Sequence, residues 1–161
     1  MDSTMNLTIG IKGSQKLGAQ SVPLQEGYLK LGGIVDNAGD PLPFGVVVSA
    51  ETATPAFVSA GTGTGRIVRG IAVFDDAIAQ NAPAHSNSYL SGFQCAIANK
   101  GLVQLQTWET GQTPAIGNKV QFNDDTGEIG FTATTATTDH TLLEGATVVE
   151  VTDDSAFVWL A

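Results

Sequence analysis

The sequence predicts one all-β domain: a small antiparallel barrel or sandwich, built largely from hairpins and containing little helix. The chain has 161 residues, which fits a single domain on the usual scale of roughly 150 residues per domain. Only 14% of the residues are charged and 19 are glycine, so the Lys, Glu and Arg that cover exposed helices are scarce. Short β-branched runs are separated by Gly, Pro, Asn and Asp at fairly regular spacing, which is typical of strands joined by turns.

The first half of the chain holds short strands. We expect them over residues 7–11, 28–34, 44–48, 56–59 and 67–74. Residues 36–43 form a turn whose two prolines cannot continue a ladder of hydrogen bonds. The glycine-rich residues 61–65 form a flexible link. Residues 76–80 can form a single helical turn, which Pro83 ends.

The second half of the chain predicts three hairpins, which form most of the barrel or sandwich. Their strands pair residues 93–98 with 102–108, 119–123 with 128–132, and 147–151 with 156–160. The first turn is Asn99-Lys-Gly, in which Gly101 can take the positive φ that a tight hairpin requires. Residues 133–141 are of low complexity, and we expect them to form an exposed loop.

We divide the chain into residues 1–20, an N-terminal arm or first strand, and residues 21–161, a barrel-like domain. Leu7, Ile9 and Ile11 alternate with polar or small residues, which predicts a β-capable segment. Two interpretations of this segment are open. It is either the first strand of its own barrel or an arm that adds a strand to the sheet edge of a neighbour, where main-chain hydrogen bonds supply affinity.

The charge balance excludes several classes of partner. The chain has 16 acidic and 7 basic residues, a net charge of −9. This leaves too few Lys and Arg to neutralise the phosphates of a nucleic acid or to bind an anionic membrane. No apolar run approaches the roughly 20 residues that span a bilayer, and the N-terminus lacks the features of a signal peptide. We therefore expect no nucleic acid and no membrane partner, and a protein made and kept, or assembled, inside a cell.

The sequence does not support a catalytic or phosphate-binding motif. Residues 61–66 are rich in glycine, but the residues that follow have a strand pattern, whereas a phosphate loop must lead into a helix. The sequence contains neither a Walker A motif nor the Gly-x-Ser-x-Gly elbow of a nucleophilic serine. Cys95, the single cysteine, alternates with Phe93 and Ile97, which predicts a small core residue rather than a reactive thiol. We assign no catalytic residue and no cofactor.

Metal ligands are equally sparse. His85 and His140 lie far apart in polar, loop-like contexts, which is typical of solvated side chains. Residues 36–40 and 124–128 carry oxygens that calcium could use, but they lack the spacing of a calcium loop. Asp, Asn and Gly are also the residues that tight turns favour. We therefore interpret both segments as turns and assign no metal site.

A resemblance is carried by the order of several short motifs. They are Gly-Ile-Ala at 70–72, Tyr-x-x-Gly at 89–92, Lys-Gly at 100–101, Pro-Ala-x-Gly-x-x-Val at 114–120 and Gly-Ala at 145–146. The series resembles the structural cement, or head decoration, proteins of tailed bacteriophages over about residues 28–161. Residues 1–20 fall outside the resemblance.

The resemblance implies a non-enzymatic virion protein that binds the outer surface of a phage capsid and stabilises it. Its partner would be the major capsid protein, and it would be made in the host cytoplasm, with self-association as a dimer or trimer on the shell as a further expectation. The alternative is a small adhesive or carbohydrate-binding β module on a virion surface. That module would need exposed aromatic rings, whereas Trp108 and Trp159 lie in strand patterns more typical of a core.

Overall fold

The computed structural model describes residues 19–22, 29–75 and 87–161. Every regular element within these ranges is a β-strand, which confirms the predicted all-β fold class. The predicted strand over residues 7–11 and the predicted helical turn over 76–80 lie outside the described residues. No described segment is a helix long and apolar enough to cross a bilayer.

The strands are mostly short, because Gly, Pro and Asp clusters interrupt the chain every few residues. In chain order they are β1 (Ala19–Val22), β2 (Leu29–Val35), β3 (Leu42–Pro43), β4 (Val47–Glu51), β5 (Phe57–Ala60), β6 (Arg66–Val73), β7 (Ser88–Tyr89), β8 (Gln94–Leu105), β9 (Lys119–Asn123), β10 (Ile129–Thr132), β11 (His140–Val151) and β12 (Ala156–Leu160).

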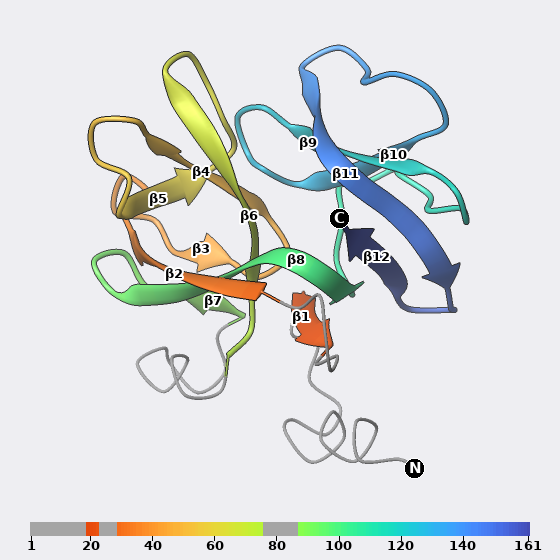
Figure 1. The fold of residues 1–161 in the computed structure, drawn as a ribbon, viewed down its shortest axis with the longest axis horizontal. Helices are drawn as coiled ribbons and strands as arrows, with labels where there is room; N and C mark the ends of the chain where they lie inside the picture. The colour runs from red at the N-terminus through yellow and green to blue at the C-terminus, as the bar shows by residue number, and fades with distance from the viewer. Residues whose placement is uncertain (1–18, 23–28, 76–86) are drawn as a thin grey trace.

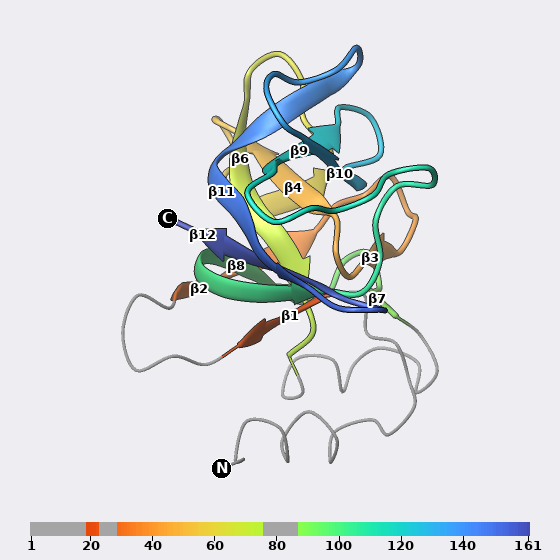
Figure 2. The same ribbon diagram turned by 90° about the vertical axis from the view of Figure 1, so that its right-hand side faces the viewer.

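The molecule has two lobes that lie side by side along its longest axis and share strand β8 (Figure 1). Figure 2 shows the molecule along that axis, with the lobe of strands β9 to β12 toward the viewer. We call residues 29–75 and 87–105 the barrel lobe, and residues 106–161 the C-terminal lobe. In the barrel lobe the strand order is β8-β2-β5-β4-β6, and β6 pairs back onto β8, which closes the barrel. The pair β2–β5 is parallel, because β5 folds back from β4 and inserts beside β2.

The C-terminal lobe is built from two of the three predicted hairpins, but these lie beside the closed barrel, whereas the sequence predicts that they form most of it. Strands β9 and β10 flank the turn 124–128, and β11 and β12 flank the turn 152–155. Strand β11 is longer than expected, since its first half pairs with β9 and its second half with β12. Of the predicted loop over 133–141, residues 133–139 do form a loop, and the last two residues begin β11.

The predicted hairpin at Asn99-Lys-Gly101 is wrong, because β8 is one continuous strand of 12 residues. Gly101 does have a positive φ of 102°, but the chain does not reverse there. The two halves of β8 pair with different strands instead of with each other: the first half pairs with β2 and β6, and the second with β1 and β12. A turn-like composition thus marks the point where β8 passes from one lobe to the other.

Two smaller predictions also differ from the structure. The strand expected over 44–48 begins at Val47, because Phe44 lies in a turn and Val46 forms only an isolated bridge to Glu128, although both side chains are buried. Pro43 was expected to lie in a turn, but it forms the two-residue strand β3 with Leu42 and pairs with Ser88. Such a short strand in a two-stranded sheet tolerates a proline, since it needs few donors.

The two lobes are joined by backbone contacts as well as by β8. The Thr62 nitrogen donates to the Asp124 carbonyl at 2.8 Å, and the Val47 nitrogen donates to the Gly127 carbonyl at 2.8 Å. Gly61 and Gly127 both have positive φ, and a Cβ on either would lie within 2.4 Å of a carbonyl oxygen of the opposite segment. Glycine is therefore what allows these two backbones to approach, and a single core cluster continues through both lobes.

Candidate contact surface

The glycine-rich loop behaves as its context predicts. Residues 61–65 connect β5 to β6, so a strand and not a helix follows the glycines. Arg66 is occupied structurally: its Nε donates to Ser49 Oγ at 2.8 Å, and its guanidinium also donates to the Ser49 carbonyl oxygen and to Ser59 Oγ. The guanidinium therefore joins β6 to the strands β4 and β5.

Cys95 is a core residue, as predicted. Its side chain is fully buried next to Ile97 on β8, and burial raises the pKa of the thiol to about 11. The prediction that Phe93 shares this core position is wrong, because Phe93 precedes the strand and is 46% exposed. The alternation rule fails there because the chain enters β8 through a turn at Gly92, which has a positive φ.

The interpretation of His140 as a solvated loop residue is also wrong. It begins β11, its side chain is 11% exposed, and its Nε2 lies 2.7 Å from Oε2 of Glu109. Its Nδ1 lies 2.7 Å from the Thr138 carbonyl oxygen, which can only accept a hydrogen bond. Both ring nitrogens thus face acceptors, and the hydrogen bond to Glu109 raises the pKa of His140. His85 lies outside the described residues.

Both acidic segments form turns, as predicted. The amides of Asp125 and Thr126 donate to Asn123 Oδ1, and the amide of Asp40 donates to the Asn37 carbonyl. In the part of the chain that the structure describes, no three His, Cys, Asp or Glu side chains gather as a metal site would require.

The tryptophans are only partly in the core. Trp159 lies on β12 and is half-buried. Trp108 lies beyond the end of β8, not within a strand as expected, and its ring packs edge-on against Phe131 with centroids 5.8 Å apart. It also lines a pocket of about 210 Å³, together with the residues Phe44 and Glu128.

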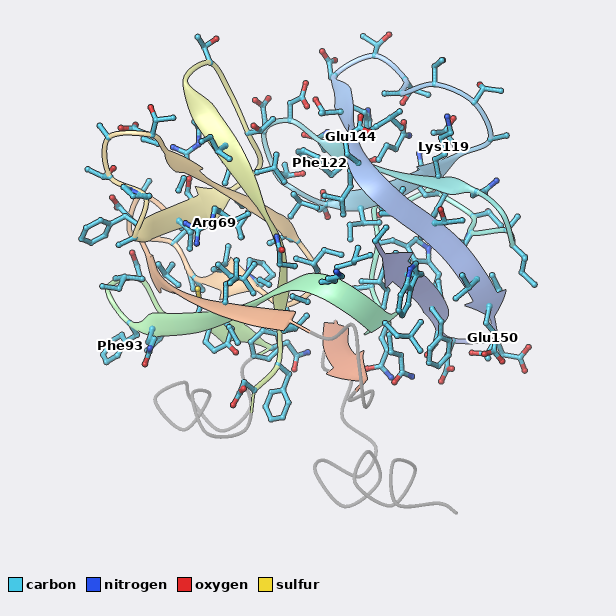
Figure 3. The ribbon with its side chains drawn as sticks, in the orientation of Figure 1. Arg69, Phe93, Lys119, Phe122, Glu144 and Glu150 are labelled. Carbon is cyan, nitrogen blue, oxygen red and sulfur yellow. The ribbon has the colours of Figure 1, made fainter. Side chains whose placement is uncertain are left out.

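An exposed apolar patch lies on the outside of the barrel lobe. We define the barrel patch as Ile34, Phe57 and Phe93, which are 37%, 45% and 46% exposed. The register places Ile34 opposite Phe57 of β5 and opposite Gln94 of β8, the residue after Phe93. Phe93 points outward from the end of the molecule formed by the barrel lobe (Figure 3).

The barrel patch is held in place by the strands beneath it. Val35 and Val58 follow Ile34 and Phe57 in the same register, and both are buried in the barrel. Because side chains alternate across a strand, burying these two valines forces their neighbours outward. The Val35 nitrogen donates to the Phe93 carbonyl at 2.9 Å, which ties the third residue of the patch to β2.

Charge divides unevenly between the lobes. Residues 106–161 contain nine acidic residues and one lysine, a net charge of −8, whereas residues 29–105 contain five acidic and four basic residues, a net charge of −1. Glu144 and Glu150 are exposed on β11, in the C-terminal lobe (Figure 3). The net negative charge of the protein therefore belongs almost wholly to one lobe.

The C-terminal lobe also exposes a smaller apolar pair. Ile116 is 70% exposed and Val149 is 45% exposed. Their segments are neighbours, since the Gly117 nitrogen donates to the Val148 carbonyl at 2.8 Å. This pair lies in the acidic lobe and not in the near-neutral one.

A groove of about 400 Å³ lies between the lobes. It is lined by apolar side chains, including Leu142 and Leu160, and by the polar groups Arg69, Asn99 and Glu144. Arg69 already donates to the Pro55 carbonyl, and Asn99 Nδ2 donates to the Arg69 carbonyl at 2.8 Å. The Asn99 bond joins β8 to β6 beside the groove, and the Arg69 bond joins β6 to the segment between β4 and β5.

Neighbouring apolar side chains exposed on the outside of a closed barrel are typical of a surface that docks onto another protein. The comparisons agree with that class. The model of the family described as "Structural cement protein (E217 gp24/Pam3 gp6)" matches residues 2–161, so the chain belongs to the structural cement protein family of phages. The match includes residues 2–20, so the expectation that the N-terminal segment falls outside the family is wrong.

A solved structure shares the fold. Its title is "The capsid of Myoviridae Phage XM1", and one of its chains superposes with a TM-score of 0.63 at 12% sequence identity. The alignment covers 88% of this chain and 91% of that chain. No protein with a curated function matches the sequence.

Proposed function

We propose that this protein is a non-enzymatic virion component that binds the outer surface of a phage capsid and stabilises it. The observation that carries the proposal is the family match over residues 2–161. The exposed apolar side chains on a closed barrel support it, because they provide a rigid surface for docking. Its partner is the major capsid protein, and it reaches the capsid exterior after synthesis in the host cytoplasm.

The surface chemistry suits such docking. Only 14% of the residues are charged, so few long, flexible side chains lose conformational freedom at an interface. A protein that binds the assembled shell but not its separated subunits stabilises the shell by mass action, by about 2.7 kcal/mol per site when its free concentration is 100 times Kd. Shell symmetry also favours its arrangement as a dimer or trimer on the capsid.

Co-sedimentation tests the proposal directly. Purified protein is mixed with expanded, undecorated heads of the cognate phage, and bound protein is measured in the pellet. We expect saturable binding and a higher temperature of DNA release from decorated heads. Protein that stays in the supernatant at every concentration would refute capsid binding, and binding without any shift in the release temperature would refute stabilisation.

One observation favours a second candidate, a carbohydrate-binding module. Trp108 and Glu128 line the same pocket of about 210 Å³, and sugar sites combine an aromatic ring with a nearby carboxylate. Titration with oligosaccharides from the host surface, followed by tryptophan fluorescence, would test this candidate. The signal must vanish in Trp108→Phe if the pocket is the site.

A further inference from the structure

We propose that the protein docks onto the shell with its barrel lobe, through Ile34, Phe57 and Phe93, and holds its C-terminal lobe away from the shell. This inference rests on the proposed function and adds the orientation of the bound molecule. The occupant of the barrel patch is a low-charge, apolar area on the outer face of the capsid protein.

The barrel patch provides the apolar contact surface. Ile34 and Phe57 lie on the paired strands β2 and β5, Phe93 lies just before β8, and all three side chains expose more than a third of their surface. Gly32, two residues before Ile34 on the same face of β2, adds no side chain of its own beside the patch, and the Gln94 amide lies 3.7 Å from where its Cβ would be. Aromatic side chains fixed on a rigid frame are the residues that contribute most to affinity when an interface covers them.

The C-terminal lobe carries most of the negative charge of the protein. Its net charge is −8, and seven of its nine carboxylates are on exposed residues: Asp125, Glu128, Asp139, Glu144, Glu150, Asp153 and Asp154. Covering these carboxylates would cost free energy unless the shell offered a matching set of bases. Residues 29–105, which contain the barrel lobe, have a net charge of only −1, so covering the barrel patch carries no such penalty.

The geometry makes the two lobes face in different directions. They lie at opposite ends of the longest axis, with Phe93 at one end and Glu150 at the other (Figures 1 and 3). Backbone hydrogen bonds from Thr62 to Asp124 and from Val47 to Gly127 fix one lobe relative to the other. Docking by the barrel patch therefore presents the acidic lobe to solvent, where repulsion between decorated particles keeps them dispersed.

Paired variants and a salt titration test this orientation. The barrel variant is Phe57→Ser with Phe93→Ser, and the matched control is Ile116→Ser with Val149→Ser, which removes exposed apolar groups from the other lobe. All four side chains are at least 45% exposed, so both variants should fold, and thermal unfolding of the free proteins checks this. We expect head binding to weaken at least tenfold in the barrel variant and less than twofold in the control.

Salt provides an independent readout. Docking through an apolar, near-neutral surface should change Kd by less than threefold between about 50 and 500 mM salt, because little charge is screened. The orientation is overturned if the control variant loses binding as strongly as the barrel variant, or if binding falls steeply with salt. Wild-type protein that fails to bind heads at all overturns the proposed function instead, which separates the two failures.

Discussion

Replacing Gly127 by alanine should weaken the junction between the lobes. Gly127 is buried with a φ of 73°, a conformation that disfavours any residue with a Cβ. The added Cβ would lie 2.4 Å from the Val47 carbonyl oxygen and 2.7 Å from the Gly61 nitrogen. Both are backbone atoms, so the turn must move away from the barrel lobe.

The magnitude follows from the contacts that this movement breaks. The left-handed conformation alone costs an alanine about 1 kcal/mol. The Val47–Gly127 hydrogen bond of 2.8 Å and the Gly61–Val47 hydrogen bond of 2.9 Å both lie in the crowded region, and each contributes about 1 kcal/mol. We therefore expect a loss of about 3 kcal/mol, or roughly 9 °C in the thermal midpoint at about 3 °C per kcal/mol.

Gly65→Ala is the matched control. Gly65 has a φ of 76°, nearly that of Gly127, but a Cβ there would meet nothing within 4 Å. It should lose only the conformational part, about 1 kcal/mol or 3 °C. Thermal and urea unfolding monitored by circular dichroism give both values. Equal losses in the two variants would refute the argument, since steric crowding at the junction would then contribute nothing.

Three further predictions concern buried groups. Cys95 should resist thiol reagents in the native protein and react on unfolding, and Cys95→Ala should cost about 1 kcal/mol or more; rapid native labelling would contradict its core position. Tyr89→Phe should cost about 1–3 kcal/mol in urea unfolding, because its hydroxyl donates to the Val73 carbonyl and accepts from the Asp75 nitrogen; a neutral effect would contradict this. The raised pKa of His140 means that its contribution to stability is complete below pH 6.5, its unfolded value, and is lost as the pH rises through the folded value. Thermal midpoints measured across this range should therefore fall with rising pH, and His140→Gln should flatten the slope.

The sequence predicted local structure better than pairing. The hairpins β9–β10 and β11–β12 follow from short runs around turn residues, and each is settled by contacts between neighbours in the sequence. The continuity of β8 depends instead on four partner strands from distant parts of the chain. No local pattern distinguishes a strand that changes partners at Gly101 from a hairpin that turns there. The division into residues 1–20 and 21–161 stays a prediction.

The exposure and the partners of single side chains were also harder to predict, because they depend on residues distant in the sequence. The fully buried position of Cys95 follows from alternation within one strand, but the exposure of Phe93 depends on where that strand begins. Glu109 and His140 are 31 residues apart, and nothing near either residue signals that they meet. The charge asymmetry between the lobes, in contrast, is visible in the sequence once the boundary between the lobes is known.

The shared strand β8 makes the two lobes depend on each other. Its first half completes the barrel that supports Phe93, and its second half pairs with β12, which holds the acidic hairpin β11–β12. Loss of either lobe would leave half of β8 with unpaired backbone groups, and exposing a strand edge in this way is unfavourable. The lobes should therefore unfold in one cooperative transition, although only one of them is proposed to touch the shell. Backbone pairing fixes the orientation of one lobe relative to the other as long as the protein is folded, so the proposed docking face and the acidic face stay at opposite ends of one rigid fold.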